Sequence, residues 1–182
     1  KLLGAKMGAI AILHTWDQRL RFHPHIHFIV PAGGLDKNGN WKNSKQDGDF
    51  LFDVEQMSPF FSARFAMKLR RLKRQGKICK YVPRNLIEKP WVVYAKQAFG
   101  SPESVVEYLG RYTHRVAISN ARILKVTDSQ VTFSWRDRKN AYEKKTETIT
   151  GVEFLKRFLD HIVPPYFRRV RHLGFLSTCN KT

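Results

Sequence analysis

Two apolar segments near the start of the chain, joined by a short polar connection, constrain the fold more than any other feature. Residues 7–16 (MGAIAILHTW) and residues 25–30 (HIHFIV) each have the length and apolar composition of a core strand. Because the connection between them is short, we expect the two strands to pair antiparallel. The sequence therefore predicts a hairpin at the beginning of the fold.

Turn and capping residues divide the rest of the chain into further helices and strands. Ser58 and Pro59 are typical of the cap and first position of a helix, and Gly76 is typical of its end. Thr150 and Glu153 form a capping box for a last helix. That helix is expected to carry Val152, Leu155, Phe158, Leu159 and Ile162 inward. The other expected elements are a hairpin turn at Asn38-Gly39, a strand at residues 91–94, a helix at residues 101–114, and a strand meander at residues 116–126, 130–136 and 141–148.

Two histidines in the second strand are candidate metal ligands. Side chains alternate along a strand, so His25 and His27 lie on one face, and we expect Ile26 and Phe28 on the other face, in the core. Two imidazoles at this spacing can share a divalent cation, and the donor set suits Mg²⁺, Mn²⁺ or Zn²⁺ without choosing among them. The ion would act as a Lewis acid on a phosphate oxygen. The alternative is a pair of surface histidines with no metal. The third ligand stays open among His14, Gln18, Asp17 and His23.

Two tyrosines in the predicted helix at residues 101–114 are candidate nucleophiles. Tyr108 and Tyr112 are four residues apart and therefore share one helical face. A phenol with a pKa of about 10 is a poor nucleophile at neutral pH. Nearby Arg111 and Arg115, together with a metal-polarised phosphate, would favour its attack and give a phosphotyrosine. The alternative is that one or both rings pack in the core.

The charge balance of the chain points to a polyanionic partner. Its 33 Lys and Arg residues oppose 15 Asp and Glu residues, for a formal net charge of +18. Such an excess destabilises a compact state through self-repulsion, and nucleic acid is the leading partner that would compensate it. The first helix carries a one-signed outer face, formed by Arg64, Lys68, Arg70, Arg71, Lys73 and Arg74. Candidate platforms for stacked bases are Trp16, Phe22, Trp41 and Trp135.

Composition also excludes several classes of protein. No run approaches the roughly 20 apolar residues that a membrane span needs, so no membrane partner is expected. The two cysteines, Cys79 and Cys179, have no CxxC partner, which favours a reduced, cytoplasmic setting over a disulfide framework. A chain of 182 residues is long enough for one sizeable core, and we expect a single domain.

The stretches LHTWDQRLRFHPHIHFIVPAGGL and VEYLGRYTHRVAISNARIL resemble the HUH endonuclease superfamily. More narrowly, they are similar to the two-tyrosine rolling-circle transposases of the IS-ninety-one type. The HUH signature, which is His, a hydrophobic residue and His, corresponds here to residues 25–27. The resemblance implies an α+β fold related to ferredoxin and palm folds, in which a central antiparallel sheet carries the metal site and helices pack on it. It implies one catalytic domain over residues 1–182. The family's cysteine-rich zinc-binding region is missing from this sequence, so we expect a catalytic core or a shortened relative.

The resemblance also implies a reaction and a set of site residues. A tyrosine would attack a scissile phosphodiester of single-stranded DNA at transposon ends and at the target, giving a 5′-phosphotyrosine and a free 3′-hydroxyl, and rejoining would follow. Mg²⁺ or Mn²⁺ is the expected cofactor, and the expected location is the bacterial cytoplasm in association with the nucleoid. A homodimer is a further partner arrangement that stays open at this point. The site residues are His25 and His27 with Gln18 or His14 as metal ligands, Tyr108 and Tyr112 as nucleophiles, and Arg111, Arg115, His114, Arg64, Lys68 and Arg71 as DNA contacts.

Two alternatives to a transposase stay open at this point. A rolling-circle replication initiator or a relaxase would use the same chemistry. A non-catalytic basic module would bind nucleic acid without cutting it. A denaturant-resistant protein–DNA adduct would separate the enzymes from the module.

Overall fold

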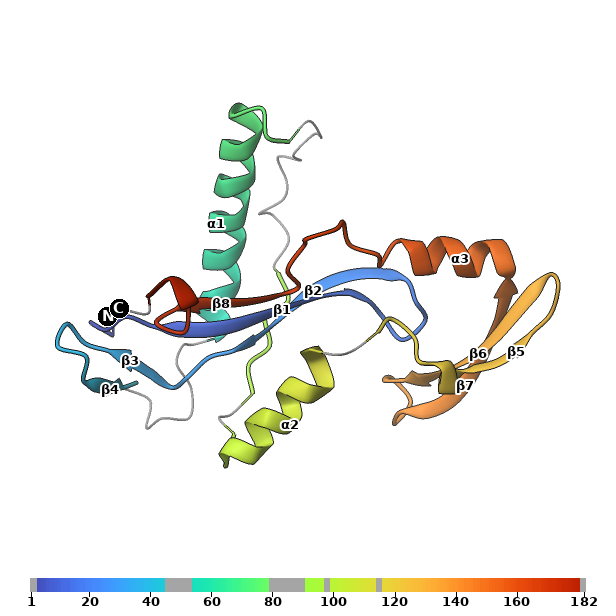
Figure 1. Cartoon of the computed structure of the whole chain (residues 1–182), viewed down its shortest axis with the longest axis horizontal. Helices are drawn as coiled ribbons and strands as arrows, with labels where there is room; N and C mark the ends of the chain where they lie inside the picture. The colour runs from blue at the N-terminus through green and yellow to red at the C-terminus, as the bar shows by residue number, and fades with distance from the viewer. Residues whose placement is uncertain (1–2, 45–53, 79–90, 97–98, 114–115, 181–182) are drawn as a thin grey trace. The chain divides into compact units, whose positions relative to one another are not determined.

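The structure of this chain is a computed structural model, and it describes residues 3–44, 54–78, 91–96, 99–113 and 116–180 (Figure 1). Backbone contacts group the chain into two compact units. One unit is formed by Lys1–Met7 with Pro31–Ala98, and the other by Gly8–Val30 with Phe99–Thr182. The described residues form an α+β fold with antiparallel sheets and three α-helices, so the expected fold class is confirmed at this level.

The described elements of the first unit come, along the chain, between β2 and α2 of the second unit (Figure 1). The first unit contains β3 (Gly33–Leu35), β4 (Trp41–Asn43) and α1 (Val54–Arg74). The second unit contains β1 (Gly8–Trp16), β2 (Phe22–Ile29), α2 (Pro102–Thr113), β5 (Ile123–Val126), β6 (Gln130–Asp137), β7 (Glu143–Thr150), α3 (Gly151–Leu159) and β8 (Val170–Gly174), with short 3₁₀ turns at Asn120–Arg122 and Thr178–Asn180.

The histidine motif lies in a three-stranded sheet of order β2-β1-β8. Both pairings are antiparallel, so the hairpin expected from the two apolar segments is confirmed. His14 of β1 is directly opposite His25 of β2, and Ile12 is opposite His27. Residues directly opposite each other share a face, so one face of the sheet carries all four of these side chains. The C-terminal strand β8 pairs with β1 and makes it the central strand.

The outer face of β2 differs from the expectation. Ile26 and Phe28 were expected in the core, but they are 47% and 46% exposed. Among the described strands β2 is an edge strand, so these two side chains have strand neighbours on one side only. Alternation along β2 is correct, because His25 and His27 lie opposite to Ile26 and Phe28, but alternation does not specify which face is covered.

The turn between β1 and β2 is fixed by one carboxylate and one buried leucine. Asp17 accepts hydrogen bonds from the backbone N–H groups of Arg19 and Arg21, at 2.8 and 2.9 Å. Burial raises the pKa of Asp17, but these hydrogen bonds and the Arg21 side chain outweigh it and lower the pKa overall. Leu20 takes the left-handed conformation, with φ 59°, and is fully buried. The turn therefore inserts its leucine into a neighbouring core.

That core belongs to a second antiparallel sheet of order β5-β6-β7, with α3 along one side of it (Figure 1). Phe133 of β6 is fully buried and forms the core with Leu20, Ala117 and Ile118. The capping box at the start of α3 is present in part, since the Thr150 hydroxyl accepts the backbone N–H of Glu153. Burial of Leu20 in this core attaches the turn of the β1–β2 hairpin to the second sheet, and this contact restricts movement of the hairpin.

The face of α3 that packs on this core was predicted only in part. Phe158 packs against the core as expected, together with Phe154, which the sequence pattern did not single out. Four side chains expected to point inward are instead more than half exposed, namely Val152, Leu155, Leu159 and Ile162. A helix of nine residues offers a narrow contact to the sheet, and two phenylalanines four residues apart fill it.

An ion-pair network joins the hairpin turn to β7 and α3. Glu147 of β7 binds Arg19 at 2.6 Å and Arg157 at 3.1 Å, and Arg157 also binds Glu153 at 2.7 Å. The hydrogen bond from Arg19 lowers the pKa of Glu147 most strongly, burial acts in the opposite direction, and Arg157 lowers it further. The Glu147 side chain is only 12% exposed, so these bonds are shielded from water.

Replacing Glu147 with Gln is expected to reduce stability at neutral pH by about 2 kcal/mol, because two charged hydrogen bonds are weakened in a shielded site. For a chain of this size that corresponds to a drop in Tm of roughly 4 to 8 °C in thermal unfolding. The pKa of Glu147 is lower folded than unfolded, so its stabilisation is complete above the ordinary value of 4.5 and is lost as the pH falls through the lowered value.

The matched control for this prediction is Glu143→Gln on the same strand. Glu143 is 63% exposed and lies 3.6 Å from Lys145, so its replacement is expected to change stability by less than about 0.5 kcal/mol. The difference in Tm between the Glu147→Gln variant and the parent protein should become smaller as the pH is lowered. Equal losses in both variants at neutral pH would contradict a special role for the Glu147 network.

The first unit contains a short hairpin and a long basic helix. β3 and β4 pair antiparallel around the expected turn, where Gly39 has φ 83°. Helix α1 begins at Val54, so Pro59 lies inside the helix and not at its first position as predicted. The predicted end is confirmed, because Gly76 has φ 68° just after the helix. The N–H of Gly76 donates to the Lys73 carbonyl, and the N–H of Lys77 donates to the Leu72 carbonyl.

Residues 91–94 form no strand, although the sequence predicts one. Trp91 instead packs against Phe61 and Phe65 of α1, with ring centroids 5.5 and 4.8 Å apart. The backbone carbonyl of Trp91 accepts a hydrogen bond from the Ser58 hydroxyl. Across the described parts of the chain, none of the helices is long and apolar enough to cross a membrane.

Candidate functional site

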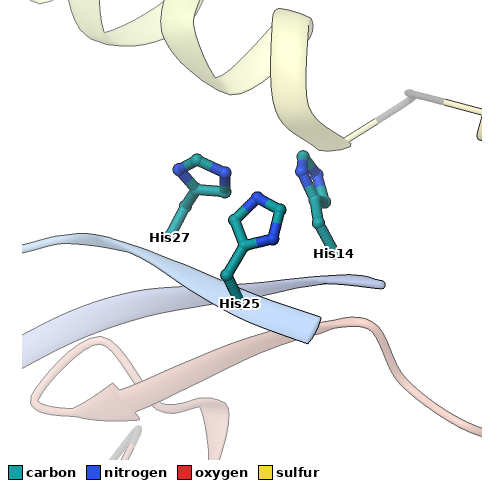
Figure 2. A group of neighbouring side chains, drawn as sticks. All are labelled: His14, His25 and His27. Atoms are coloured by element: carbon teal, nitrogen blue, oxygen red, sulfur yellow. The ribbon is translucent and has the colours of Figure 1, made fainter. Parts of the chain in front are cut away.

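Three imidazoles lie together on one face of the β2-β1-β8 sheet (Figure 2). His14 comes from β1 and is 4% exposed, whereas His25 and His27 come from β2 and are half-buried. One ring nitrogen from each residue lies within 4.8 Å of the other two. The rings rise from the sheet towards α2 in Figure 2. Strand register explains the cluster, because His14 is directly opposite His25 and His27 is two residues further along the same face.

Two of these rings make hydrogen bonds through Nδ1, and the bond of His25 fixes which atom donates. The Nδ1 of His25 lies 2.8 Å from the backbone carbonyl of His23. A carbonyl oxygen only accepts, so this Nδ1 donates, and in the neutral form of the ring Nε2 is the nitrogen with the lone pair. The Nδ1 of His27 lies 3.2 Å from the hydroxyl of Tyr108. A metal-binding histidine commonly uses one nitrogen for the ion and the other for such a contact.

Tyr108 reaches the cluster from α2. It lies 81 residues after His27 in sequence, yet its hydroxyl contacts that ring directly. The phenol ring is half-buried and packs against Phe99, with centroids 5.2 Å apart. Tyr108 is therefore partly packed, as the core alternative supposed, but its hydroxyl faces the imidazoles. No sequence pattern pointed to Phe99, which supports the ring from a segment just before the helix.

The remaining residues predicted on this helix are described less fully. Tyr112 lies in the last turn of α2, four residues after Tyr108, so its backbone position places it on the same helical face. The side chains of Tyr112 and Arg111 lie outside what the structure describes, as do His114 and Arg115 altogether. Their expected roles stay predictions.

The structure separates the candidates for the third ligand. Gln18 lies in the turn beyond β1, where its side-chain oxygen faces the backbone N–H of Arg136 at 3.5 Å. Its backbone carbonyl accepts a hydrogen bond from Arg122. Asp17 is engaged in fixing the same turn. His23 lies near His25, with ring centroids 5.3 Å apart, but it is not among the three residues whose ring nitrogens all lie within 4.8 Å of one another. His14 is the candidate whose ring lies with His25 and His27.

Aromatic contacts hold the His14 ring in place. It stacks on Trp16, with centroids 4.9 Å apart and an interplanar angle of 17°. Trp16 in turn contacts the buried ring of His161 and the guanidinium of Arg169. The Nε2 of His161 donates to the carbonyl of Leu20 in the hairpin turn. Trp16 was a candidate platform for bases, but its ring is stacked on His14 and supports that side chain. Strand pairing alone does not predict this contact.

The other candidate platforms differ in how accessible they are. Trp135 has Arg19 and Lys145 over its ring, at 5.2 and 6.0 Å from the centroid. Phe22 and Trp41 are 61% and 49% exposed, so their rings are open to solvent. The cations over Trp135 compete with a base for the same ring.

The basic residues predicted to contact DNA lie along α1. Arg64, Lys68 and Arg71 are all exposed, and Arg64 lies over the Phe60 ring at 5.2 Å. Lys68 and Arg71 also line a hollow of about 270 Å³ near the end of the helix. These residues belong to the first unit and the histidine cluster to the second.

Comparison with known proteins identifies the family. Residues 8–182 match a family model of the Y2 transposase type, described as "Putative transposase". The chain belongs to the Y2 transposase family. It is 39% identical to "Putative transposase y4qJ" of Sinorhizobium fredii strain NBRC 101917 / NGR234, over 96% of this chain and 47% of that protein. It is 30% identical to "Transposase for insertion sequence element IS801" of Pseudomonas savastanoi pv. phaseolicola, over 97% of this chain and 45% of that protein.

The Y2 transposase chain therefore spans about half the length of the curated relatives it matches. No solved structure matches it. The family agrees with the sequence resemblance to two-tyrosine rolling-circle transposases, and the family match includes both the histidine strand and the tyrosine helix.

Proposed function

We propose that this chain is a catalytic region of a transposase that cuts and rejoins single-stranded DNA through a tyrosine nucleophile, on an HUH-type fold. One observation carries the proposal: the Tyr108 hydroxyl lies 3.2 Å from Nδ1 of His27, within a cluster of three imidazoles. A phenol beside a potential metal site is the pairing that phosphoryl transfer to tyrosine needs. The family match across residues 8–182 supports treating both units as one catalytic domain.

The donor set of the cluster fits a divalent cation. Two nitrogens that each bind one ion at about 2.1 Å lie at most roughly 4.2 Å apart. The three candidate nitrogens lie within 4.8 Å of one another, so small side-chain rotations suffice. Three neutral imidazoles leave the charge of the ion uncompensated, and when bound it would polarise a phosphate oxygen. Nitrogen ligands favour Mn²⁺ over Mg²⁺ between the two expected ions.

The chain's own residues supply the nucleophile and its orientation. If Nε2 of His27 faces the ion, its Nδ1–H donates to the Tyr108 oxygen and stabilises negative charge there. The phenol oxygen then forms a bond to phosphorus, and the bond between phosphorus and the 3′-oxygen breaks. The phenol loses its proton to water, and the 3′-oxygen takes one from water. The products are a 5′-phosphotyrosine and a free 3′-hydroxyl.

Three further groups of residues complete the proposal. Tyr112, one turn after Tyr108, would accept the second strand, with Arg111, Arg115 and His114 near the scissile phosphate. Arg64, Lys68 and Arg71 of α1 would bind the DNA backbone, because they are exposed cations on one helix. Stacking of bases on the exposed rings of Phe22 or Trp41 would add sequence-tolerant affinity.

Labelling either end of the DNA separates this reaction from simple hydrolysis. Single-stranded oligonucleotides from the ends of the encoding element are incubated with the protein and Mn²⁺. A 3′ label is expected to remain on the protein through denaturation, and a 5′ label should appear on a shorter strand that a polymerase can extend. EDTA should abolish both signals, and Mn²⁺ should restore them more than Mg²⁺ does. Binding without any adduct, in every metal and for every strand from the element ends, would overturn the proposal.

A further inference from the structure

The acidic side chains of the β5–β6–β7 sheet all lie on one of its two faces. Strand register places Asp137 directly opposite Glu143, and Glu147 opposite Phe133, so all three acids of β6 and β7 share the face that carries the Phe133 core. The acids of this face are engaged: Lys145 lies within 4.0 Å of Asp137 and Glu143, and Glu147 binds Arg19. Helix α3 lies along this side of the sheet (Figure 1).

The opposite face, which we name the hydroxyl face, carries cations and no acid among the residues of its three strands. Arg136 is directly opposite Lys144, and Lys125 of β5 is opposite Thr132. All three cations are exposed, and no ion pair links them to a described acid. Polar side chains of β6 and β7 lie between them, namely Gln130, Thr132, Ser134, Thr146, Thr148 and Thr150. Ser134 is buried, so the other five are the ones that can meet a ligand.

The side chains of the hydroxyl face suit phosphate groups. Threonine hydroxyls and lysine or arginine cations are the usual partners of the nucleic-acid backbone. The hydroxyls of Thr132 and Thr148 lie 2.8 Å apart, so one donates to the other and further lone pairs and protons point outward. No aromatic side chain belongs to this face, so it offers contacts to phosphates and not platforms for unstacked bases.

We propose that the hydroxyl face is a second DNA-binding surface, which contacts backbone phosphates of duplex DNA beside the strand that is cut. Charge complementarity carries the proposal, because the sheet places every acid on its packed face in a chain of net charge +18. The proposal shares with the proposed function only the premise that the chain acts on DNA. Duplex is favoured over single strands because stacked bases leave phosphates as the accessible groups.

The test compares two triple variants with the same net charge. The first is Lys125→Gln, Arg136→Gln and Lys144→Gln on the hydroxyl face. The control is Lys37→Gln, Lys96→Gln and Lys156→Gln, which removes three exposed cations elsewhere. Binding to a labelled duplex is measured by anisotropy between 50 and 200 mM salt, in EDTA. Each lost phosphate contact reduces the magnitude of the slope of log affinity against log salt by about 0.9. The slope of the hydroxyl-face variant should therefore fall by roughly 2 to 3, and its affinity should be at least about tenfold lower than that of the parent.

The control variant should keep the slope and affinity of the parent protein, and both variants should keep its Tm, because all six side chains are exposed. Equal loss in the two variants would show that net charge alone matters and would overturn the proposal, as would unchanged binding in both. Binding in EDTA requires neither a metal nor tyrosine attack. A failed cleavage assay therefore leaves this result intact, and a failed binding test leaves the proposed cleavage standing.

Discussion

Tyr108→Phe is expected to reduce formation of the covalent protein–DNA adduct by at least roughly 10³-fold, to below detection in a denaturing gel. The change removes one oxygen, which is the atom that lies 3.2 Å from Nδ1 of His27. The ring can still pack on Phe99, so the Tm and the affinity for uncleaved DNA should remain close to those of the parent. A loss of adduct with retained binding would assign chemistry, and not folding, to the hydroxyl.

Tyr142→Phe is the matched control for this experiment. Tyr142 is 59% exposed and belongs to the same unit, so its replacement should leave the adduct unchanged. Tyr112→Phe, tested in parallel, reports on the second nucleophile, and peptide mapping of the adduct assigns the tyrosine directly. An adduct that survives Tyr108→Phe and maps to Tyr112 would contradict the assignment of first attack to Tyr108.

The second large effect concerns the histidine cluster. His25→Ala is expected to weaken Mn²⁺ binding by at least about 100-fold, measured by paramagnetic resonance of the free ion in the absence of DNA. The same variant should lose the adduct, because both effects follow from one missing ligand. His172→Ala is the control, since His172 is an exposed histidine on β8 of the same sheet. Equal Mn²⁺ affinity in the two variants would show that the cluster is not a metal site.

The third ligand is decided by a pair of variants in the same binding assay. His14→Gln is expected to weaken Mn²⁺ binding as strongly as His25→Ala, whereas Gln18→Ala should leave it within about twofold of the parent. Glutamine replaces histidine because His14 is buried and alanine would leave a cavity beside Trp16. A reversed pattern, with Gln18 sensitive and His14 neutral, would require the turn to reorganise on binding and would overturn the geometric assignment.

The contrast between His14 and Gln18 shows what a linear pattern cannot decide. Both lie near the end of β1, and either could reach His25 if the strand alone is considered. The antiparallel register places His14 opposite His25, and burial of Leu20 turns the chain so that Gln18 faces Arg136. Register and the neighbouring core depend on contacts between distant segments, which local periodicity does not contain.

The apolar face of α3 gives a second example. Hydrophobic spacing predicted Val152, Leu155 and Leu159 inward, but the sheet contacts Phe154 and Phe158. An amphipathic pattern identifies which residues are apolar, and the partner surface decides which of them it covers. The same limit applies to Ile26 and Phe28 on the edge strand β2, whose alternation was predicted correctly and whose burial was not.

The amino-acid sequence by itself determined the β1–β2 hairpin, the shared face of His25 and His27, helix α2 with Tyr108, and the resemblance to two-tyrosine transposases, because each depends on neighbouring residues or on matched motifs. Only the tertiary structure brought His14 into the cluster and placed the Tyr108 hydroxyl against His27 across 81 residues. It also placed all the acids of the β5–β6–β7 sheet on one face. These features depend on strand register and on packing between segments far apart in the chain, and packing selects one of several arrangements that local patterns allow.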